Sequence, residues 1–387
     1  MSQLYILIGF LFFSYISSGQ NTSSDSVSII GLGSTDSSSV MFYNNYLPFV
    51  KVNIDNVEYD FLFDTGAELC ILSKDIAKSS LNKGDIVASD MEGNAQDAKL
   101  YEIDLQLGST SIEKIQCIEL DLKSIFGASC IEIDGVIGQN LIRKLNWQFE
   151  TERGVVFWSK VPFVMGSGGK QLDLEYYGDL PLTKVSYDNL SFYVLLDTGF
   201  DGLLELNSGG IKKSKKYKKS TKSCGVGKHQ ITISGAKTQK VTLATLDSVM
   251  LGTGYLTEVP TYISNSKPLL GSLLFQNHNV TFNFTEDKVL LSPSRKLPEK
   301  VQNFGVGLGL NENNKAEVVF IWKESEAYKQ GLRLGHIISK INDVDVSQIS
   351  QQDLCALKAE VLKREILELR FVYKGKTKFI ALSRASM

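Results

Sequence analysis

The feature that most constrains the fold of this 387-residue chain is a long internal repeat. Residues 61–67 read Phe-Leu-Phe-Asp-Thr-Gly-Ala, and residues 194–200 read Val-Leu-Leu-Asp-Thr-Gly-Phe, an offset of 133 residues. A second motif, two apolar residues and a glycine, ends at Gly138 and again at Gly271, in each case 74 residues after the Asp. A repeated unit of this length indicates a duplicated domain, because the units of solenoid proteins are shorter.

Each copy of the first motif reads as a buried strand that ends in a carboxylate. The three apolar residues before Asp64 and before Asp197 are a run short enough for a buried strand. A buried Asp must be hydrogen-bonded or coupled to another charge, because an unpaired one is costly. Taken alone, one such tripeptide would indicate only a turn after a core strand. The second copy at matched spacing makes a shared function for the two Asp residues the better interpretation.

The two motif pairs resemble those of the aspartic peptidases, both retropepsin-like and pepsin-like, over roughly residues 40–295. The resemblance implies a mostly β protein with two homologous acid-protease β-barrel lobes in a pseudo-twofold pair, at residues 41–165 and 170–295. Asp64 and Asp197 would be the catalytic pair. The residues implied to support the catalytic loops are Thr65, Gly66, Thr198, Gly199, Gly138 and Gly271. No metal or organic cofactor is implied, and a chain that carries both Asp residues should act as a monomer on protein or peptide substrates.

Turn signals predict a hairpin in each repeat between the two motifs. The first spans residues 86–107 with its turn at 91–94, and the second spans residues 230–246 with its turn at 234–236. The resemblance implies that such a hairpin folds over the substrate as a flap. Two further hairpins, at residues 147–158 and 280–291, are expected to close the two repeats, and residues 140–145 to form a short helix.

The sequence changes character after a proline-containing linker at residues 293–300. Strands are expected near residues 305–308 and 318–321, a helix at 354–363 and a hairpin at 367–382. This pattern resembles a PDZ domain of the kind attached to bacterial proteases, at residues 300–385. The resemblance implies that the loop Gly305, Val306, Gly307 and Leu308 binds a peptide carboxylate while the peptide adds as a strand. The alternative is a module that packs on the rest of the chain and binds no peptide.

The N-terminus predicts export. Residues 4–16 are nearly all apolar and are followed by Ser-Ser-Gly, which indicates a secretory signal peptide at residues 1–19 and a periplasmic, cell-surface or secreted protein. No Lys or Arg precedes Lys51, so a retained N-terminal membrane anchor is the alternative. Residues 20–40 are rich in Ser, Asn, Thr and Asp and are expected to be a flexible lead-in.

Composition and the remaining motifs exclude several other classes. The chain is 43% hydrophobic with a net charge of −2, which gives no reason to expect a nucleic-acid partner, and we interpret the basic run at residues 212–219 as solvated surface. The three His residues form no hydrolase motif. The five cysteines are scattered and predict neither a disulfide framework nor a zinc site, so we expect buried small hydrophobes, with a Cys117–Cys130 bridge as the alternative. The cysteines are Cys70, Cys117, Cys130, Cys224 and Cys355.

Two Asp side chains within hydrogen-bonding distance share one proton, as aspartic proteases generally do. Such a pair can activate water for peptide hydrolysis without a covalent intermediate. In pepsin-like enzymes a hydroxyl after Asp-Thr-Gly bonds the carboxylate, but here these positions are Ala67 and Phe200. Losing these donors and adding apolar surface should raise the pKa of the pair and move activity toward mildly acidic or near-neutral pH. The alternative function is a catalytically inactive scaffold or peptide-binding protein with a protease fold.

Overall fold

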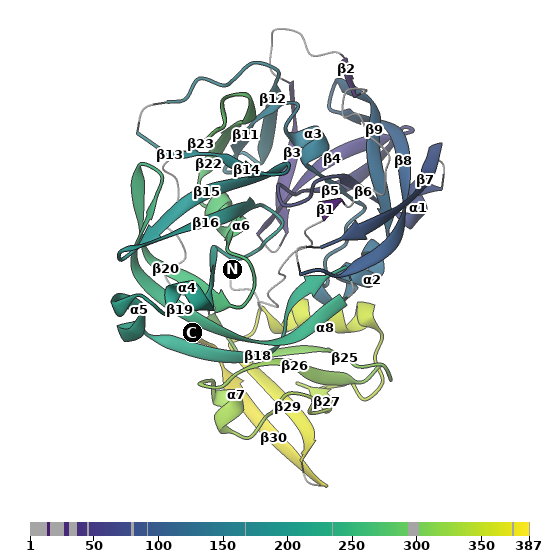
Figure 1. The fold of residues 1–387 in the computed structure, drawn as a ribbon. Coiled ribbons are helices and arrows are strands. Elements are labelled where there is room, and N and C mark those ends of the chain that lie inside the picture. The colour runs from purple at the N-terminus through teal and green to yellow at the C-terminus, as the bar shows by residue number, and fades with distance from the viewer. Residues whose placement is uncertain are drawn as a thin grey trace.

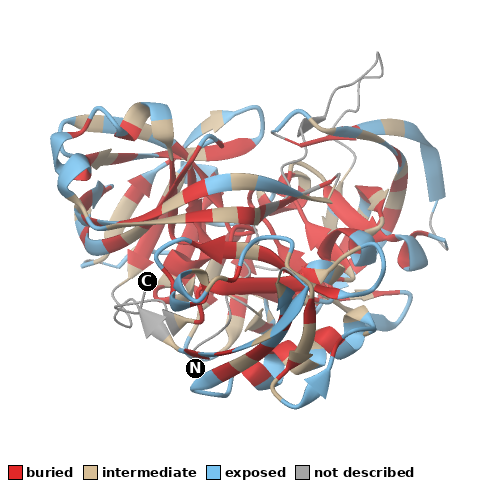
Figure 2. Cartoon of the chain, turned by 90° about the horizontal axis from the view of Figure 1, so that it is seen from below, coloured by how far each residue is buried: buried red, intermediate tan, exposed pale blue. Residues whose placement is uncertain are grey.

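The computed structural model describes residues 14–15, 27–30, 37–44, 46–78, 81–90, 92–166, 168–233, 235–292, 302–373 and 375–386. Strands hold 57% and helices 14% of the structure, so the fold is mostly β, as predicted. Buried and exposed residues alternate along many of these strands (Figure 2). The expected linker at residues 293–300 and most of the expected signal peptide and lead-in lie outside the described residues.

The first repeat is built from one large sheet. Its strands include β3 (Ser37–Asn44), β4 (Leu47–Ile54), β5 (Val57–Phe63), β6 (Cys70–Ser73), β7 (Leu81–Ser89), β8 (Ala95–Leu107), β9 (Thr110–Leu120), β10 (Gly135–Ile137), β11 (Asn146–Glu150) and β12 (Val155–Ser159). Its short helices are α1 (Lys74–Ala77), α2 (Leu122–Phe126), the 3-10 turn η2 (Gly127–Ser129) and α3 (Gln139–Ile142). Two N-terminal pieces add to this sheet: β1 (Ser14–Tyr15) pairs with β7, and β2 (Ser28–Ile30) pairs with β9. Parts of the expected lead-in are therefore strand, as is the start of β3.

The second repeat follows the same order. Its strands are β13 (Lys170–Asp173), β14 (Glu175–Tyr177), β15 (Leu180–Tyr187), β16 (Leu190–Asp197), β17 (Leu204–Asn207), β18 (Lys222–Thr232), β19 (Gly235–Leu251), β20 (Gly254–Ser264), β21 (Leu269–Gly271), β22 (Asn279–Asn283) and β23 (Lys288–Ser292). Its helices are α4 (Ser208–Ile211), α5 (Lys215–Lys219), α6 (Ser272–Gln276) and the 3-10 turn η3 (Phe284–Glu286). Most of these strands, β14 to β21, belong to a second sheet of ten strands. Within it, β15 pairs with both β16 and β19, so the sheet curls back on itself.

The hairpins predicted from turn signals are present, and two of them join the repeats. Strands β7–β8 and β18–β19 form the two hairpins between the motifs. The closing hairpins β11–β12 and β22–β23 pair side by side through β11 and β22, with Trp147 opposite Phe282. The Phe63 ring, next to Asp64, lies 5.0 Å from the Trp147 ring and 4.9 Å from the Phe149 ring. The core thus continues from one repeat into the other directly beneath the first motif.

The C-terminal region, residues 302–386, contains the strands and helices expected there. Its elements are β24 (Gln302–Asn303), β25 (Val306–Leu310), β26 (Ala316–Trp322), α7 (Glu326–Lys329), β27 (Ile338–Ile341), β28 (Val344–Asp345), α8 (Gln351–Val361), β29 (Ile366–Tyr373), β30 (Lys376–Ser383) and β31 (Ala385–Ser386). It lies below the two repeats in Figure 1, and β26 pairs with β18 so that the sheet of the second repeat continues into this region. Among the described residues, no helix is long and apolar enough to cross a membrane.

The cysteine prediction needs correction. Cys130 and Cys355 form a disulfide across a sequence separation of 225 residues, with a Cα–Cα distance of 5.3 Å. The Cys117–Cys130 alternative is therefore wrong. Cys70 and Cys117 are buried free thiols, as the interpretation of buried small hydrophobes expects, and Cys224 is free and half-buried. The Cys130–Cys355 pairing joins the first repeat to the C-terminal region and has no spacing signature in the sequence.

Candidate active site

The two motifs of each repeat meet as parallel strands. In the first repeat β10 runs parallel to β5, with Ile137 beside Phe63, and the Asp64 amide donates to the Ile137 carbonyl at 3.0 Å. In the second repeat β21 runs parallel to β16, with Gly271 beside Asp197. The equal 74-residue spacing in the sequence therefore corresponds to equal pairing in the structure. Both Asp residues are placed at the ends of buried strands, where the backbone is fixed on both sides.

Two threonines cross between the repeats and bind the loops to each other. The Thr65 amide donates to Thr198 Oγ1 and the Thr198 amide donates to Thr65 Oγ1, each at 3.0 Å. The hydroxyls then donate onward, Thr65 to the Leu196 carbonyl at 2.6 Å and Thr198 to the Phe63 carbonyl at 2.5 Å. All four bonds are buried, so each is protected from competition by water. The network fixes the distance between the two motifs.

The two carboxylates lie side by side at this junction. Gly66 donates its amide to Asp64 Oδ1 at 2.7 Å, and Gly199 donates to Asp197 Oδ1 at 2.9 Å. The carboxyls are within hydrogen-bonding distance of each other, a bond that exists only when one of them carries a proton. With both ionised, Asp197 Oδ2 is a buried acceptor without a donor among the described residues. The geometry therefore favours a pair that holds one proton.

Close approach at Gly199 explains why the motif needs glycine. A Cβ built on Gly199 would lie 2.5 Å from Asp64 Oδ2 and 2.6 Å from its carboxyl carbon. Any side chain there would push the two carboxylates apart. The Gly138 and Gly271 positions are equally restricted, because a Cβ on Gly138 would overlap the Leu69 carbonyl and one on Gly271 would overlap the Gly202 carbonyl. These glycines let the second motif pack directly against the Asp-Thr-Gly loop.

Burial raises the pKa of both carboxyls. Asp64 is 2% exposed and Asp197 is 0% exposed. Desolvation raises the pKa of Asp64 to about 6, opposed by hydrogen bonds from the backbone amides of Gly66, Gly199 and Ala67 and from Asp197. Desolvation and then the charge of Asp64 hold the pKa of Asp197 well above its usual range. The direction agrees with the expectation drawn from Ala67 and Phe200.

Two polar residues that were not predicted from the sequence donate hydrogen bonds to the Asp-Thr-Gly loops. Gln139 donates its side-chain amide to the Thr65 carbonyl at 2.7 Å, and Ser272 donates its hydroxyl to the Phe200 carbonyl at 2.9 Å. Each directly follows the glycine of the second motif, at Gly138 and Gly271. Their shared position one residue after that glycine is the signal that could have found them.

Phe200 does not stand over the carboxylates as free apolar surface. It is fully buried in a cluster of the second repeat that also contains Trp322 of the C-terminal region. Ala67, the matching residue of the first repeat, is also fully buried, in a cluster that contains Ile231 and Ile233 of hairpin β18–β19. The residues after the two Asp-Thr-Gly motifs therefore connect the site to two different neighbours.

The residues expected to form a carboxylate-binding loop lie far from this site in the sheet order. Val306, Gly307 and Leu308 are part of strand β25 and pair with β26. Gly305 has φ +74°, and its amide donates to the Asn303 side chain at 2.7 Å. Strand β25 ends the ten-stranded sheet, so one of its edges has no partner among the described strands. Among the described residues, no group of three or more His, Cys, Asp or Glu side chains is arranged to hold a metal ion.

A comparison with known protein families finds a match to part of the first repeat. A family model described as "Aspartyl protease" matches residues 50–141, which include Asp64, Thr65, Gly66 and Gly138. A search of curated proteins finds no match to the chain. The match supports an aspartyl protease domain in this part of the protein, and a general protease function with it.

Proposed function

We propose that the chain is an aspartic-type endopeptidase in which each repeat forms one lobe and supplies one Asp to a single site. The observation that carries the proposal is the crossed pair of threonine bonds, which holds Asp64 and Asp197 side by side. Two buried carboxyls sharing one proton combine a base and an acid in one place. Because both come from the same chain, the enzyme works as a monomer.

The chemistry follows from the shared proton. A water molecule between the carboxyls gives a proton to the ionised partner as its oxygen attacks the carbonyl carbon of the scissile bond. The protonated partner donates to the carbonyl oxygen, which yields a tetrahedral diol. Collapse of the diol breaks the C–N bond, and the leaving amine takes a proton from the pair. We assign acid and base to the pair rather than to Asp64 or Asp197 alone, because coupled groups titrate together.

The backbone amides at the motif tune this pair. Gly66 and Gly199 donate to the Oδ1 atoms, while Asp197 Oδ2 is buried and receives no donor among the described residues. These donors stabilise the charged form and keep one carboxyl ionised despite its burial. Hairpins β7–β8 and β18–β19 act as flaps that exclude bulk water and hold the extended substrate by backbone hydrogen bonds.

For the C-terminal region we propose a PDZ-like peptide-binding role. Support comes from strand β25, which lies at the end of its sheet and is preceded by Gly305. A protein substrate or C-terminal peptide would add as a strand along β25, with α8 beside it. Its carboxylate would need free amides, and the Gly305 amide is already bound to Asn303. The recognition we propose is therefore of an extended strand, with the amides after Gly305 left for the peptide end.

Export of the protein remains part of the proposal. The Cys130–Cys355 disulfide supports it, since disulfides form and persist in oxidising compartments such as the periplasm and the cell exterior. An N-terminal anchor that stays attached is compatible with the same compartment. Fractionation of cells that express the full chain, followed by N-terminal sequencing of the mature protein, distinguishes a cleaved signal peptide from a retained anchor.

The test of the proposed function is incubation of the purified protein with a diverse peptide pool, followed by mass spectrometry. We expect new termini that appear with the enzyme and are suppressed by a pepstatin-like inhibitor. Cleavage that resists this inhibitor but is blocked by serine, cysteine or metal reagents would contradict the proposal. Binding of peptides without any cleavage across pH 3–8 would favour the inactive scaffold instead.

A further inference from the structure

The C-terminal region holds the hairpin β18–β19 of the second repeat by its outer strand. β26 pairs antiparallel with β18, with Gly225 opposite Trp322 and Gly227 opposite Phe320. Outside the ladder, the Lys323 amide donates to the Cys224 carbonyl at 2.8 Å, and the Cys224 amide donates to Glu324 Oε2 at 2.7 Å. The hairpin is therefore a strand pair shared by two parts of the molecule (Figure 1).

Two glycines of β18 make this close pairing possible. A Cβ on Gly225 would overlap the Phe320 ring, and a Cβ on Gly227, which has φ +139°, would overlap the Val319 carbonyl. Between them, Val226 packs on the core of the C-terminal region. The sequence Gly-Val-Gly inside a strand is otherwise unfavourable, since glycine weakens strands and leaves nothing to pack. Its presence here is explained by the approach of β26.

Side chains of β26 continue from this junction to the catalytic loop. Trp322 is 5% exposed and lies in the same buried cluster as Phe200, the residue after the second Asp-Thr-Gly motif. The Phe320 ring packs edge-on against Trp322 at 5.0 Å and lies 6.2 Å from the ring of His229 on β18. His229 is buried, and burial lowers its pKa to about 3, so it remains a neutral ring in this contact. The junction is thus a buried packing of aromatic rings around a neutral His229.

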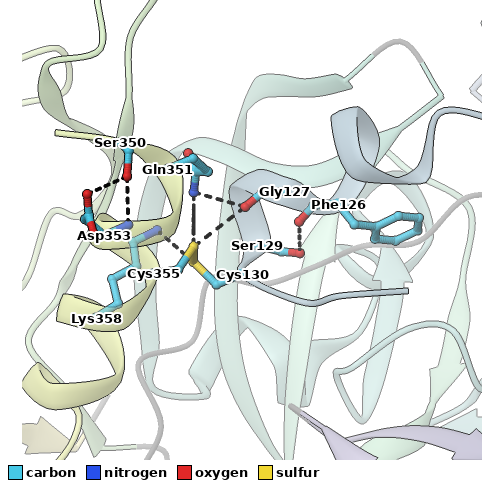
Figure 3. Close-up of a disulfide and its surroundings, with 9 residues drawn as sticks. All are labelled: Phe126, Gly127, Ser129, Cys130, Ser350, Gln351, Asp353, Cys355 and Lys358. Atoms are coloured by element: carbon cyan, nitrogen blue, oxygen red, sulfur yellow. Dashed lines mark hydrogen bonds between the residues drawn. A yellow bond between two sulfur atoms is a disulfide. The ribbon is translucent and has the colours of Figure 1, made fainter. Parts of the chain in front are cut away.

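The other end of the C-terminal region is bonded to the first repeat. Helix α8 carries Cys355, which forms the disulfide with Cys130 just after η2 (Figure 3). Gln351, one turn earlier on the helix, donates its side-chain amide to the Gly127 carbonyl at 3.0 Å. The C-terminal region therefore bridges the first repeat and the hairpin of the second.

The end of the hairpin reaches the first repeat as well. Ile231 and Ile233 are each 4% exposed and lie in the buried cluster that contains Ala67, the residue after the first Asp-Thr-Gly motif. Beyond the turn, Lys237 Nζ donates to the side-chain oxygen of Asn94, at the turn of hairpin β7–β8. The two hairpins are thus joined to each other, and β18–β19 packs beside Ala67, next to a carboxyl pair that is almost completely buried.

From these contacts we propose that the C-terminal region is a clasp that keeps hairpin β18–β19 closed over the catalytic pair, and that the Cys130–Cys355 disulfide is a thiol–disulfide exchange site that releases it. The proposal rests on the proposed peptidase function for its consequence, faster substrate entry. In the disulfide form, α8 cannot leave the first repeat, so β26 and the hairpin paired with it stay in place. Reduction leaves only the non-covalent contacts of α8.

The exchange chemistry needs a dithiol reductant. One thiolate of the dithiol attacks a sulfur of the pair, forms a mixed disulfide and releases the other cysteine as a thiolate, which takes a proton. The second thiol of the reductant, deprotonated, displaces the remaining cysteine and closes a cyclic disulfide. The protein gains two electrons and two protons, and the dithiol loses them. Both cysteines are half-buried rather than enclosed, which leaves a path for the reductant.

Lys358 supports this assignment. Its Nζ lies 3.9 Å from Cys130 Sγ, and the side chain is only 6% exposed. Burial lowers the pKa of Lys358 to about 7, so a substantial fraction carries a charge near neutral pH. A cation beside a sulfur stabilises the thiolate that leaves during exchange. Among the described residues, no carboxylate pairs with Lys358, and a buried amine is costly unless a charge compensates it, which the thiolate formed during exchange would do.

Hydrogen exchange measured by mass spectrometry tests the clasp independently of activity. The full chain is compared with and without dithiothreitol, together with Cys355→Ser and, as a matched control that keeps the disulfide, Cys224→Ser. We expect reduction to accelerate exchange in residues 222–251 by about tenfold or more, on the scale of tethering effects. Cys355→Ser should show this fast exchange without reductant and no further response, and Cys224→Ser should respond as the wild type does. Peptide cleavage should rise in the same samples.

The outcomes separate the clasp from the peptidase. Faster exchange in the hairpin with no cleavage in either redox state supports the clasp and contradicts the peptidase. Unchanged hairpin exchange, after alkylation has shown that Cys130 and Cys355 are reduced, overturns the clasp, as does a uniform rise throughout both repeats. If Cys355→Ser does not fold, Gly227→Ala replaces it: it breaks the β18–β26 pairing with the disulfide intact and should accelerate exchange in the same residues.

Discussion

The two repeats present the same Asp-Thr-Gly loop but attach it to different surroundings. In both, the threonine amide donates to the hydroxyl of the opposite threonine at 3.0 Å, and a glycine amide donates to the Asp carboxylate. Around this shared centre the repeats differ. The first places the small Ala67 after the motif, and the second places Phe200, which packs in the same cluster as Trp322 of the C-terminal region. The hydrogen bonds of the two Asp-Thr-Gly loops are therefore symmetric, whereas the packing around the loops is not.

This difference shows where a duplicated site is free to change. The carboxylates, threonines and glycines of the two loops are fixed by mutual contact, since each repeat supplies hydrogen-bond partners to the other. The positions just outside face different neighbours, and one of them, Phe200, packs in a cluster with Trp322 of the C-terminal region. Substitutions at matched positions should therefore have equal effects inside the centre and unequal effects outside it.

The largest expected effect is on activity when either carboxylate is neutralised. Asp64→Asn and Asp197→Asn should each lower kcat/KM by about 1,000-fold or more, because an amide can serve neither as base nor as shared-proton partner. The measurement is steady-state cleavage of the best peptide from the pool, with thermal unfolding as the check that both variants fold. Near wild-type turnover in either variant would contradict a site that uses both repeats.

The next prediction compares the residues that follow the two Asp-Thr-Gly motifs, where we expect unequal effects on stability. Phe200→Ala should lower the free energy of unfolding by about 3–5 kcal/mol, because it leaves a cavity in the cluster shared with Trp322. Ala67→Gly, its counterpart, should cost only about 1 kcal/mol from one buried methyl. Denaturant unfolding of both measures the difference, with Phe200→Leu as the control that keeps an apolar side chain and leaves a smaller cavity than Ala. Equal losses at the two positions would show that the C-terminal region does not stabilise the second loop.

Substitution of the two threonines should lower stability equally. Thr65→Val and Thr198→Val each keep the shape but remove a buried hydroxyl that accepts from an amide of the opposite repeat and donates to a carbonyl of that same repeat. Each should cost about 1–3 kcal/mol of stability, because an amide and a carbonyl lose their partners. The two values should agree within error, and Thr→Ser at either position should restore most of the loss. Clearly unequal losses would place the network in one repeat rather than between the two.

The smallest effect is a shift in the pH profile. Activity requires one ionised carboxyl, and burial raises the pKa of Asp64 to about 6, so kcat/KM should fall as pH drops through about 6. Ala67→Ser adds a donor that favours the charged form and should move this limb down by about one pH unit. The profile is measured on a peptide without ionisable groups near the scissile bond. A wild-type limb at about pH 2–3, or a limb that Ala67→Ser leaves unmoved, would contradict this account.

Much of the site was predictable because the motif is local and repeated. The Asp-Thr-Gly stretches, the glycines at 138 and 271, and all four hairpins follow from apolar runs and turn residues close together in the chain. What the sequence did not reveal depends on contacts between distant residues. The Cys130–Cys355 bond spans 225 residues, and Phe200 was expected near the carboxylates because nothing local shows that it faces Trp322. The glycines of β18 at 225 and 227 were the one local sign that another strand approaches there.

The most direct test of a single site shared by Asp64 and Asp197 is the stoichiometry of inhibitor binding. Titration of the purified protein with a pepstatin-like inhibitor, followed by calorimetry, counts the sites formed by Asp64 and Asp197. We expect one inhibitor per chain, with binding weakened to a similar degree by Asp64→Asn and Asp197→Asn. One inhibitor per two chains, or tight binding that depends on only one of the two Asp residues, would contradict a single site shared between the repeats of one chain.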